Sequence, residues 1–81
     1  TARPVKRSFA IRGHRTSVSL EAPFWDALKE AAAEDGRSLA GLVAEIDAHR
    51  GSANLSSAIR VFLLARFRDR AVNPRAPRRR E

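Results

Sequence analysis

The chain has no cysteine, and this absence excludes two common ways of stabilising a small protein. Without cysteine there are no disulfides and no thiolate metal ligands. The two histidines, His14 and His49, lie far apart without other obvious ligands, so a structural zinc site is not expected. With 81 residues the chain forms at most one domain, whose core is marginal for a monomer. Association with a second copy is the remaining common source of stability.

Long apolar runs are also missing, and so are the motifs of catalysis. No apolar run approaches the length of a membrane span, and the basic N-terminus is not followed by the apolar stretch of a signal peptide. The sequence has no Ser–His–Asp spacing, no Gly-rich phosphate loop and no metal signature. We therefore expect no catalytic residue, no cofactor, no metal site, no membrane contact and no enzyme. We expect a cytoplasmic protein associated with the nucleoid.

Acidic residues are scarce at both ends of the chain, which carry most of its positive charge. Residues 1–20 have a charge of +5 with no acid, residues 66–81 also have +5, and residues 21–65 have −3. Fourteen of the sixteen basic residues are arginine, the side chain suited to bidentate contacts with phosphate and guanine. This distribution favours a polyanionic partner, with nucleic acid ahead of an acidic membrane.

One stretch, "HRTSVSLE" at 14–21, alternates polar and apolar side chains as a strand does. We predict a main strand over 15–20, with residues 8–12 as an extended lead-in or a second short strand. The apolar positions change parity after Gly13, which is the natural place for a turn or bulge. No second run is equally regular, so the pattern predicts that the pairing strand comes from another copy of the chain.

The rest of the chain reads as helix. Pro23 suits a first helical turn, Gly36 suits a left-handed helix end, and Ser38 is a good N-cap. The apolar stripe of the last helix is so wide that it favours burial against a partner chain. We expect three helices, at about 22–35, 38–49 and 54–70. We expect a flexible basic arm at 1–7, a folded domain at 8–71 and a disordered Arg-rich tail at 72–81.

The polar side of the strand has two competing interpretations, while the start of the second helix is a helix cap that can also serve as an anion site. Arg15, Ser17 and Ser19 form either an ordinary solvated strand face or a set of base-reading side chains, because a two-stranded ribbon fits the DNA major groove. Ser38 and Leu39 begin a helix, and their free N–H groups, with the helix dipole, could hold a backbone phosphate.

The span "RTSVSLEAPFWDALKEAAAEDGRSLAGLVAEI", 15–46, resembles the ribbon-helix-helix DNA-binding family of the Arc/MetJ type. Together with "NLSSAIRVF" it is similar to a bacterial branch of that family with an additional C-terminal helix. The resemblance implies a mainly α homodimer with one intermolecular, two-stranded antiparallel ribbon that reads the major groove through Arg15, Ser17 and Ser19. Ser38 and Leu39 match the family's phosphate anchor. "NLSSAIR" also resembles the start of the family's second helix. The phosphate anchor is therefore either the start of the predicted helix at 38–49 or the start of the predicted helix at 54–70.

We therefore expect a dimeric, sequence-specific regulator of transcription that binds duplex DNA, acts as a repressor and assembles further on DNA. The residues expected to contact phosphates are Lys6, Arg7, Arg12, His14, Arg37, Ser38 and Leu39. The alternative is an antitoxin-like or adaptor module whose basic arms bind a protein partner. A third interpretation is a nonspecific RNA or nucleoid binder that uses only its tails.

Overall fold

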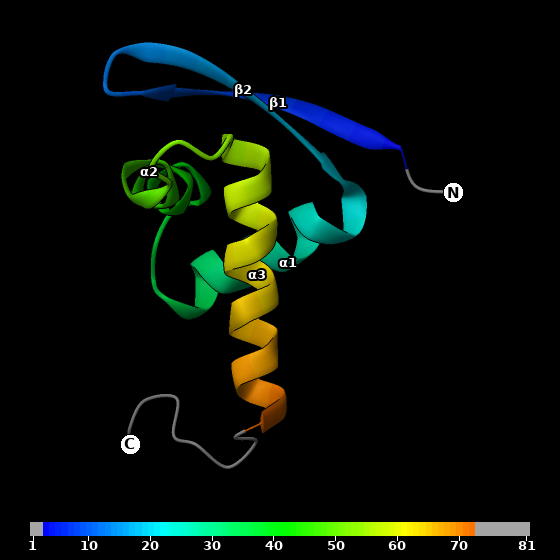
Figure 1. Ribbon diagram of the computed structural model, residues 1–81. Coiled ribbons are helices and arrows are strands. Elements are labelled where there is room, and N and C mark those ends of the chain that lie inside the picture. The colour runs from blue at the N-terminus through cyan, green and yellow to red at the C-terminus, as the bar shows by residue number, and fades with distance from the viewer. Residues whose placement is uncertain (1–2, 73–81) are drawn as a thin grey trace.

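The computed structural model describes residues 3–72 as a β-hairpin followed by three helices (Figure 1). Its elements are β1 (Pro4–Ile11), β2 (His14–Glu21), α1 (Ala22–Glu34), α2 (Leu39–His49) and α3 (Leu55–Val72). The three helices agree with the predicted ones to within two residues at each end. The expected tail beyond Val72 lies outside the described residues. No helix of the described part is long and apolar enough to cross a membrane.

The strand that pairs with β2 comes from the same chain, which corrects the expectation of a partner from another copy. β1 runs antiparallel to β2, with partners from Pro4↔Glu21 to Ile11↔His14. The two residues between the strands, Arg12 and Gly13, have φ values of 54° and 81°. Two consecutive left-handed residues form the tight turn whose twist matches a hairpin. The change of apolar parity at Gly13 is therefore a hairpin turn.

The expected arm at 1–7 is also corrected, because residues 4–7 belong to β1. The indole Nε1 of Trp25 donates a hydrogen bond to the backbone oxygen of Val5 at 2.9 Å. The Arg7 guanidinium lies 5.3 Å from the centre of the Trp25 ring, and the Phe9 ring lies 6.0 Å from it. Arg7 thus occupies a position that faces the helices. A charged residue at this position interrupts the apolar alternation and makes the strand hard to recognise in the sequence.

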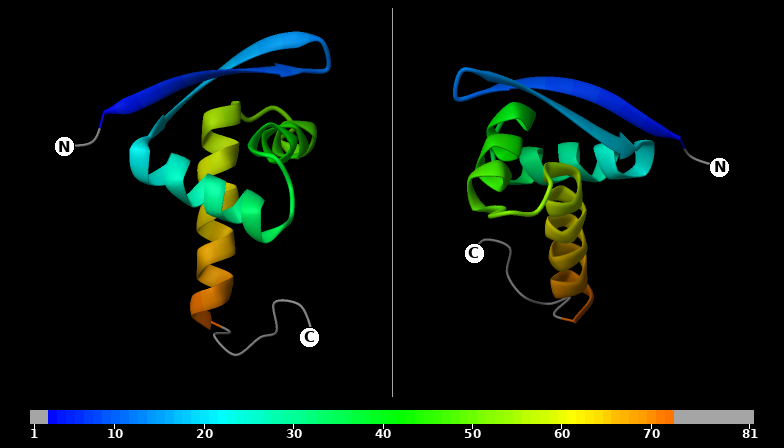
Figure 2. Two further views of the ribbon diagram at one scale, coloured as in Figure 1. Left: turned by 180° about the vertical axis from the view of Figure 1, so that it is seen from behind. Right: turned by 45° about the horizontal axis from the view of Figure 1, so that its top comes forward.

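The hairpin has one face toward the helices and one face away from them (Figure 2). All three described helices lie on the same side of the hairpin, and its inner face joins their apolar sides in one core. Val18 and Leu20 of β2 are 0% exposed, so a single chain covers the apolar side of its own strand. The buried core residues are Ile11, Val18, Leu20, Trp25, Leu28, Ala31, Ala32, Leu42, Val43, Ile46, Leu55, Ile59 and Leu63.

Ion pairs attach α3 to α1 at both ends of α1. Arg60 donates to Glu21 at 2.9 Å, just before the start of α1. Near the end of α1, Arg66 donates to Glu34 at 2.9 Å and to Asp35 at 3.0 Å, and Arg70 also pairs with Glu34. The hydrogen bond from Arg66 lowers the pKa of Glu34 below its ordinary value of 4.5, and the hydrogen bond from Arg60 lowers that of Glu21. Both carboxylates therefore favour the folded state in their charged form.

These pKa shifts predict that acid weakens the attachment of α3 to α1. A carboxyl group whose pKa is lowered by folding stabilises the fold above about pH 4.5 and loses this contribution as the pH falls through its folded pKa. We expect the melting temperature to be nearly constant from about pH 7 to pH 5 and to fall below that. Thermal melting followed by circular dichroism measures this.

The double variant Glu21→Gln with Glu34→Gln separates these pairs from the other carboxylates. It should melt at a lower temperature than the native chain at neutral pH and show a smaller further loss in acid. Glu30→Gln is the control, because this exposed carboxylate makes no ion pair within residues 3–72. Equal acid sensitivity of the native chain and the double variant would contradict the prediction.

Candidate nucleic-acid interface

The side of the hairpin turned away from the helices carries six residues from both strands. Cross-strand partners share a face, so the pairs Lys6↔Ser19, Ser8↔Ser17 and Ala10↔Arg15 all face outward together. We call residues 6, 8, 10, 15, 17 and 19 the outer hairpin face. All of them are exposed except Ser19, which is partly buried. The Oγ atoms of Ser8 and Ser17 lie 3.5 Å apart. The face is therefore polar, with Lys6 toward one end and Arg15 toward the other.

All three predicted base-reading residues lie on the outer hairpin face. Arg15, Ser17 and Ser19 alternate along β2 with Thr16, Val18 and Leu20, which turn inward. β1 adds two polar side chains to the same face. Sequence reasoning missed Ser8 and placed Lys6 in a flexible arm. The available signal was the alternation of residues 4–11 up to a two-residue turn, with Arg7 as its single interruption.

The tip of the hairpin brings together two of the predicted phosphate contacts, Arg12 and His14. Both side chains are exposed. Arg12 has a φ of 54° and is the only described residue other than glycine in the left-handed region. Arginine is not favoured in that conformation, where asparagine and glycine are common. The tip nevertheless places Arg12, His14 and Arg15 within four positions of one another.

Arg7 lies differently from the other predicted phosphate contacts of the hairpin. Its guanidinium is 5.3 Å from the centre of the Trp25 ring on the inner side of β1. A cation over an indole face is favourable, and here it also helps to fix β1 on α1. The structure therefore gives Arg7 a place in the packing, away from the outer hairpin face.

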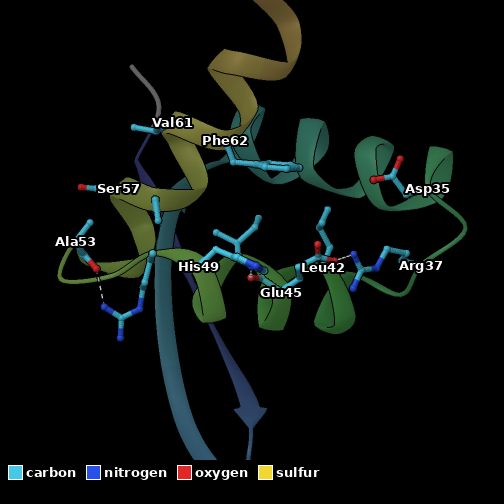
Figure 3. Close-up of a pocket in the computed structure, with 12 residues that line it drawn as sticks. Asp35, Arg37, Leu42, Glu45, His49, Ala53, Ser57, Val61 and Phe62 are labelled. Atoms are coloured by element: carbon cyan, nitrogen blue, oxygen red, sulfur yellow. Dashed lines mark hydrogen bonds and ion pairs between the residues drawn. The ribbon is translucent and has the colours of Figure 1, made fainter. Parts of the chain in front are cut away.

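The start of α2 contains the other three predicted phosphate contacts. Ser38 caps the helix, because its Oγ accepts a hydrogen bond from the backbone N–H of Gly41 at 3.0 Å. Leu39 is partly buried and packs on the core. Arg37 forms an ion pair with Glu45 and donates to the backbone oxygen of Gly41 at 3.3 Å. Figure 3 shows Arg37 folded back along α2 toward Glu45. Arg37 must leave these partners to reach a phosphate.

The start of α3 lies beside β2. Asn54 caps the helix, since its Oδ1 accepts a hydrogen bond from the backbone N–H of Ser57 at 2.8 Å. The Oγ of Ser56 accepts a hydrogen bond from the backbone N–H of Ser19 at 3.4 Å. The sequence left open which helix takes the anchor role. In the structure α3 has this direct contact with β2, while the hydrogen bonds of Arg37 and Ser38 with α2 stay within residues 37–42.

A groove of about 550 Å³ separates α2 from α3 on the side that Figure 3 shows. Its floor is apolar, with Leu42, Ile46 and Phe62, and charged side chains such as Arg37 and Glu45 stand at its rim. Within residues 3–72, no three side chains of His, Cys, Asp or Glu come together as metal ligands would. The described lining of the groove therefore lacks the donor set of a metal site.

A polar two-stranded ribbon on one side of a helical core defines a class of DNA-binding proteins, and the family comparison agrees. The model of the ribbon-helix-helix domain family matches residues 4–67, so the chain belongs to this family. The family has a non-enzymatic DNA-binding fold, and membership implies DNA binding and dimerisation.

Among solved structures, the chain is similar to an uncharacterized protein from Bordetella pertussis Tohama I. The two chains have 33% sequence identity and a TM-score of 0.74. The match covers 95% of this chain and 65% of that one, so the present chain spans slightly less than two thirds of the relative's length. No curated protein matches the chain. This relative supports the fold and indicates no function.

Proposed function

We propose that the protein is a sequence-specific regulator of transcription that inserts the outer hairpin face into the major groove of duplex DNA. The observation that carries this proposal is the outer hairpin face itself. Its side chains are mostly polar and exposed, while the opposite face of the same hairpin contributes Ile11, Val18 and Leu20 to the buried core. A two-stranded ribbon has dimensions that fit the major groove, and the family has a DNA-binding fold.

In this proposal the length and charge of each side chain on the outer hairpin face determine the DNA contact that it makes. Arg15 is the side chain that reaches a guanine edge with two hydrogen bonds. Ser17 and Ser19 donate or accept a single hydrogen bond each and refine the choice. Lys6 and Ser8, opposite these serines on β1, extend the reading surface. One chain thereby supplies both strands of its reading ribbon.

Contacts with the DNA backbone hold this ribbon in register. Arg12 and His14 at the tip are exposed and lie next to Arg15, so they are the proposed phosphate contacts of the hairpin. Ser38 and Leu39 remain the proposed contacts at the start of α2. Phosphate contacts position the protein without reading sequence, so their loss should weaken binding to all duplexes alike.

We further propose that the protein acts as a homodimeric repressor in the cytoplasm, at the nucleoid. A repressor that blocks a promoter needs only tight, specific binding, which a DNA-reading domain provides. The adaptor alternative relied on basic arms that bind a protein. Residues 4–7 lie in β1, and the C-terminal arm lies outside the described residues, so the described residues include no such basic arm.

The test is binding to the DNA upstream of the chain's own coding region, because small regulators often control themselves. A gel-shift titration and a nuclease footprint should show one protected site and weak binding to a scrambled duplex of equal length and composition. The two duplexes should differ in affinity by about 1,000-fold or more at physiological salt. Equal affinity for both duplexes, with no footprint, would exclude a sequence-specific regulator.

A further inference from the structure

The start of α2 has a single strong cation, and that cation is already bound to a carboxylate. Arg37 is the only lysine or arginine between Lys29 and Arg50, and it directly precedes the helix cap Ser38. Its Nη2 donates to the backbone oxygen of Gly41 at 3.3 Å, and its other terminal nitrogen pairs with Glu45. The side chain suited to a phosphate at the start of α2 is therefore held by a carboxylate of the same helix.

The path of the Arg37 side chain follows from the residues along this side of α2. Positions 37, 41 and 45 are four residues apart, so they lie on the same side of the helix. The middle position is Gly41, whose lack of a side chain leaves the surface between Arg37 and Glu45 uncovered. A Cβ there would lie 3.0 Å from the Oγ of Ser38, so glycine also preserves the helix cap. Arg37 can thus fold back along α2 as far as Glu45 (Figure 3).

The ion pair between Arg37 and Glu45 is open to solvent. The side chain of Arg37 is 36% exposed and that of Glu45 is 48% exposed. Within residues 3–72 the Glu45 carboxylate makes no ion pair with another residue. Ion pairs between exposed groups are weak, because water screens the charges and both side chains lose freedom. Such a pair holds Arg37 in the free protein and still permits its transfer to a stronger acceptor.

A phosphate of duplex DNA is such an acceptor. Guanidinium binds phosphate with two parallel hydrogen bonds, and the duplex surrounds that phosphate with further negative charge. The transfer has a cost, because it leaves the Glu45 carboxylate without its partner and close to a polyanion. The affinity of the protein for DNA therefore depends on Glu45 as well as on Arg37.

We propose that Glu45 competes with DNA for Arg37: it binds the guanidinium in the free protein, and a backbone phosphate replaces it in the complex. This inference rests on the proposed DNA-binding function. Glu45 acts through Arg37, so it is a positioning residue and does not itself contact DNA. No residue of the outer hairpin face takes part in the exchange. Glu45 therefore lowers the affinity for every duplex and leaves the base preference unchanged.

The exchange also affects the salt dependence of binding. A cation that neutralises one phosphate releases counterions from the duplex and contributes about −0.9 to the slope of log K against log salt. In the native chain the freed Glu45 carboxylate attracts cations while Arg37 releases them, so the two effects partly cancel. Without this carboxylate, the contact of Arg37 contributes its full share to the slope.

The first test is a double-mutant cycle of Arg37→Gln and Glu45→Gln, titrated with the upstream duplex and its scrambled counterpart. Glu45→Gln should tighten binding to both duplexes alike, by about three- to fivefold per protomer, which is the range of an exposed ion pair. Its salt slope should become steeper, by at most about 0.9 per protomer. In a chain that carries Arg37→Gln, the same change should tighten binding less than about twofold, because only a screened repulsion is removed.

Glu30→Gln is the matched control for this cycle. It removes the same charge from an exposed carboxylate on α1 that makes no ion pair within residues 3–72. Its effect on affinity should be the same with and without Arg37→Gln, and circular dichroism verifies the fold of every variant. If Glu45→Gln also has the same effect with and without Arg37, Glu45 acts only through its charge and the proposal is wrong.

The second test follows Arg37 directly by NMR of its guanidinium N–H groups, whose signals are assigned by their absence in Arg37→Gln. In the free protein Glu45→Gln should shift these signals, because the carboxylate acceptor is lost. With saturating scrambled duplex, the native chain and Glu45→Gln should give the same signals, because phosphate is the acceptor in both. Native signals that keep their free positions in the saturated complex would overturn the exchange.

The two proposals fail in different ways. If both duplexes bind equally and Glu45→Gln tightens binding only when Arg37 is present, the sequence-specific function is wrong and the role of Glu45 stands. If the upstream duplex binds specifically and Glu45→Gln changes nothing, the role of Glu45 is wrong and the function stands. A chain that binds no duplex at all contradicts both proposals.

Discussion

Replacing Arg15 with alanine should remove the preference for one base pair in each half-site while general DNA affinity changes little. Arg15 is the only arginine on the outer hairpin face, and its side chain is exposed beside the tip. The loss of one bidentate contact with guanine costs about 1–3 kcal/mol of discrimination. Two half-sites should double this effect when they act independently. Selection of binding sites from a random duplex library, for the native chain and the variant, measures the preference position by position.

The matched control for this experiment is Arg12→Asn. Arg12 lies three residues before Arg15, and asparagine is favoured in the left-handed turn conformation that Arg12 adopts, so the hairpin is retained. This variant loses one positive charge without losing a residue of the outer hairpin face. It should weaken binding to all duplexes alike and reduce the slope of log K against log salt by about 0.9 per protomer. If Arg15→Ala behaves in the same way as Arg12→Asn, Arg15 contacts phosphate and the hairpin is not the reading element.

Replacing Val18 with aspartate should unfold the chain. Val18 is 0% exposed, in the middle of the inner face of β2. A carboxylate there is buried without a partner, which costs several kcal/mol, and small domains have only about 5–15 kcal/mol of total stability. We expect loss of the helical circular dichroism signal at 25 °C and a red shift of the Trp25 emission, because the indole leaves its contacts with β1.

Ser17→Asp is the control for this change, because it places the same charge one residue away on the exposed side of the strand. It should fold normally and impair only DNA binding. The experiment also separates two views of the strand. If Val18 lay between two chains, as an intermolecular ribbon requires, Val18→Asp would give folded monomers. If it lies in the core of one chain, as in the structure, the whole domain is lost.

The helices were predictable because their signals are local. Pro23 in the first turn, Gly36 with a φ of 66° after the first helix, and the Ser38 cap each fix a boundary through contacts within four residues. The class of the protein was predictable for a related reason. The alternation of residues 14–21 places Arg15, Ser17 and Ser19 on one face whatever pairs with the strand, so the choice of these proposed reading residues did not depend on the identity of that partner.

The partner of the strand was hard to recognise from local patterns, because Arg7 interrupts the apolar alternation of residues 4–11. β1 contains Arg7 at an inward position, where its guanidinium lies over the ring of Trp25, eighteen positions later, while the residue stays exposed to solvent. The same holds for Arg37, which sequence reasoning assigned to phosphate and the structure places against Glu45. In both cases the contacts of a long cationic side chain depend on which distant residue the fold places beside it.

The sequence by itself therefore determined the three helices, the polar strand face and the excess of positive charge, because periodicity, caps and composition act over a few residues. Only the tertiary structure decided that residues 4–11 close the ribbon within one chain and bury Val18 and Leu20. It also decided that three apolar side chains of α3, Val61, Leu64 and Phe67, lie outside the core and remain exposed. These outcomes depend on contacts between residues distant in sequence, and local periodicity does not specify which residues those contacts join.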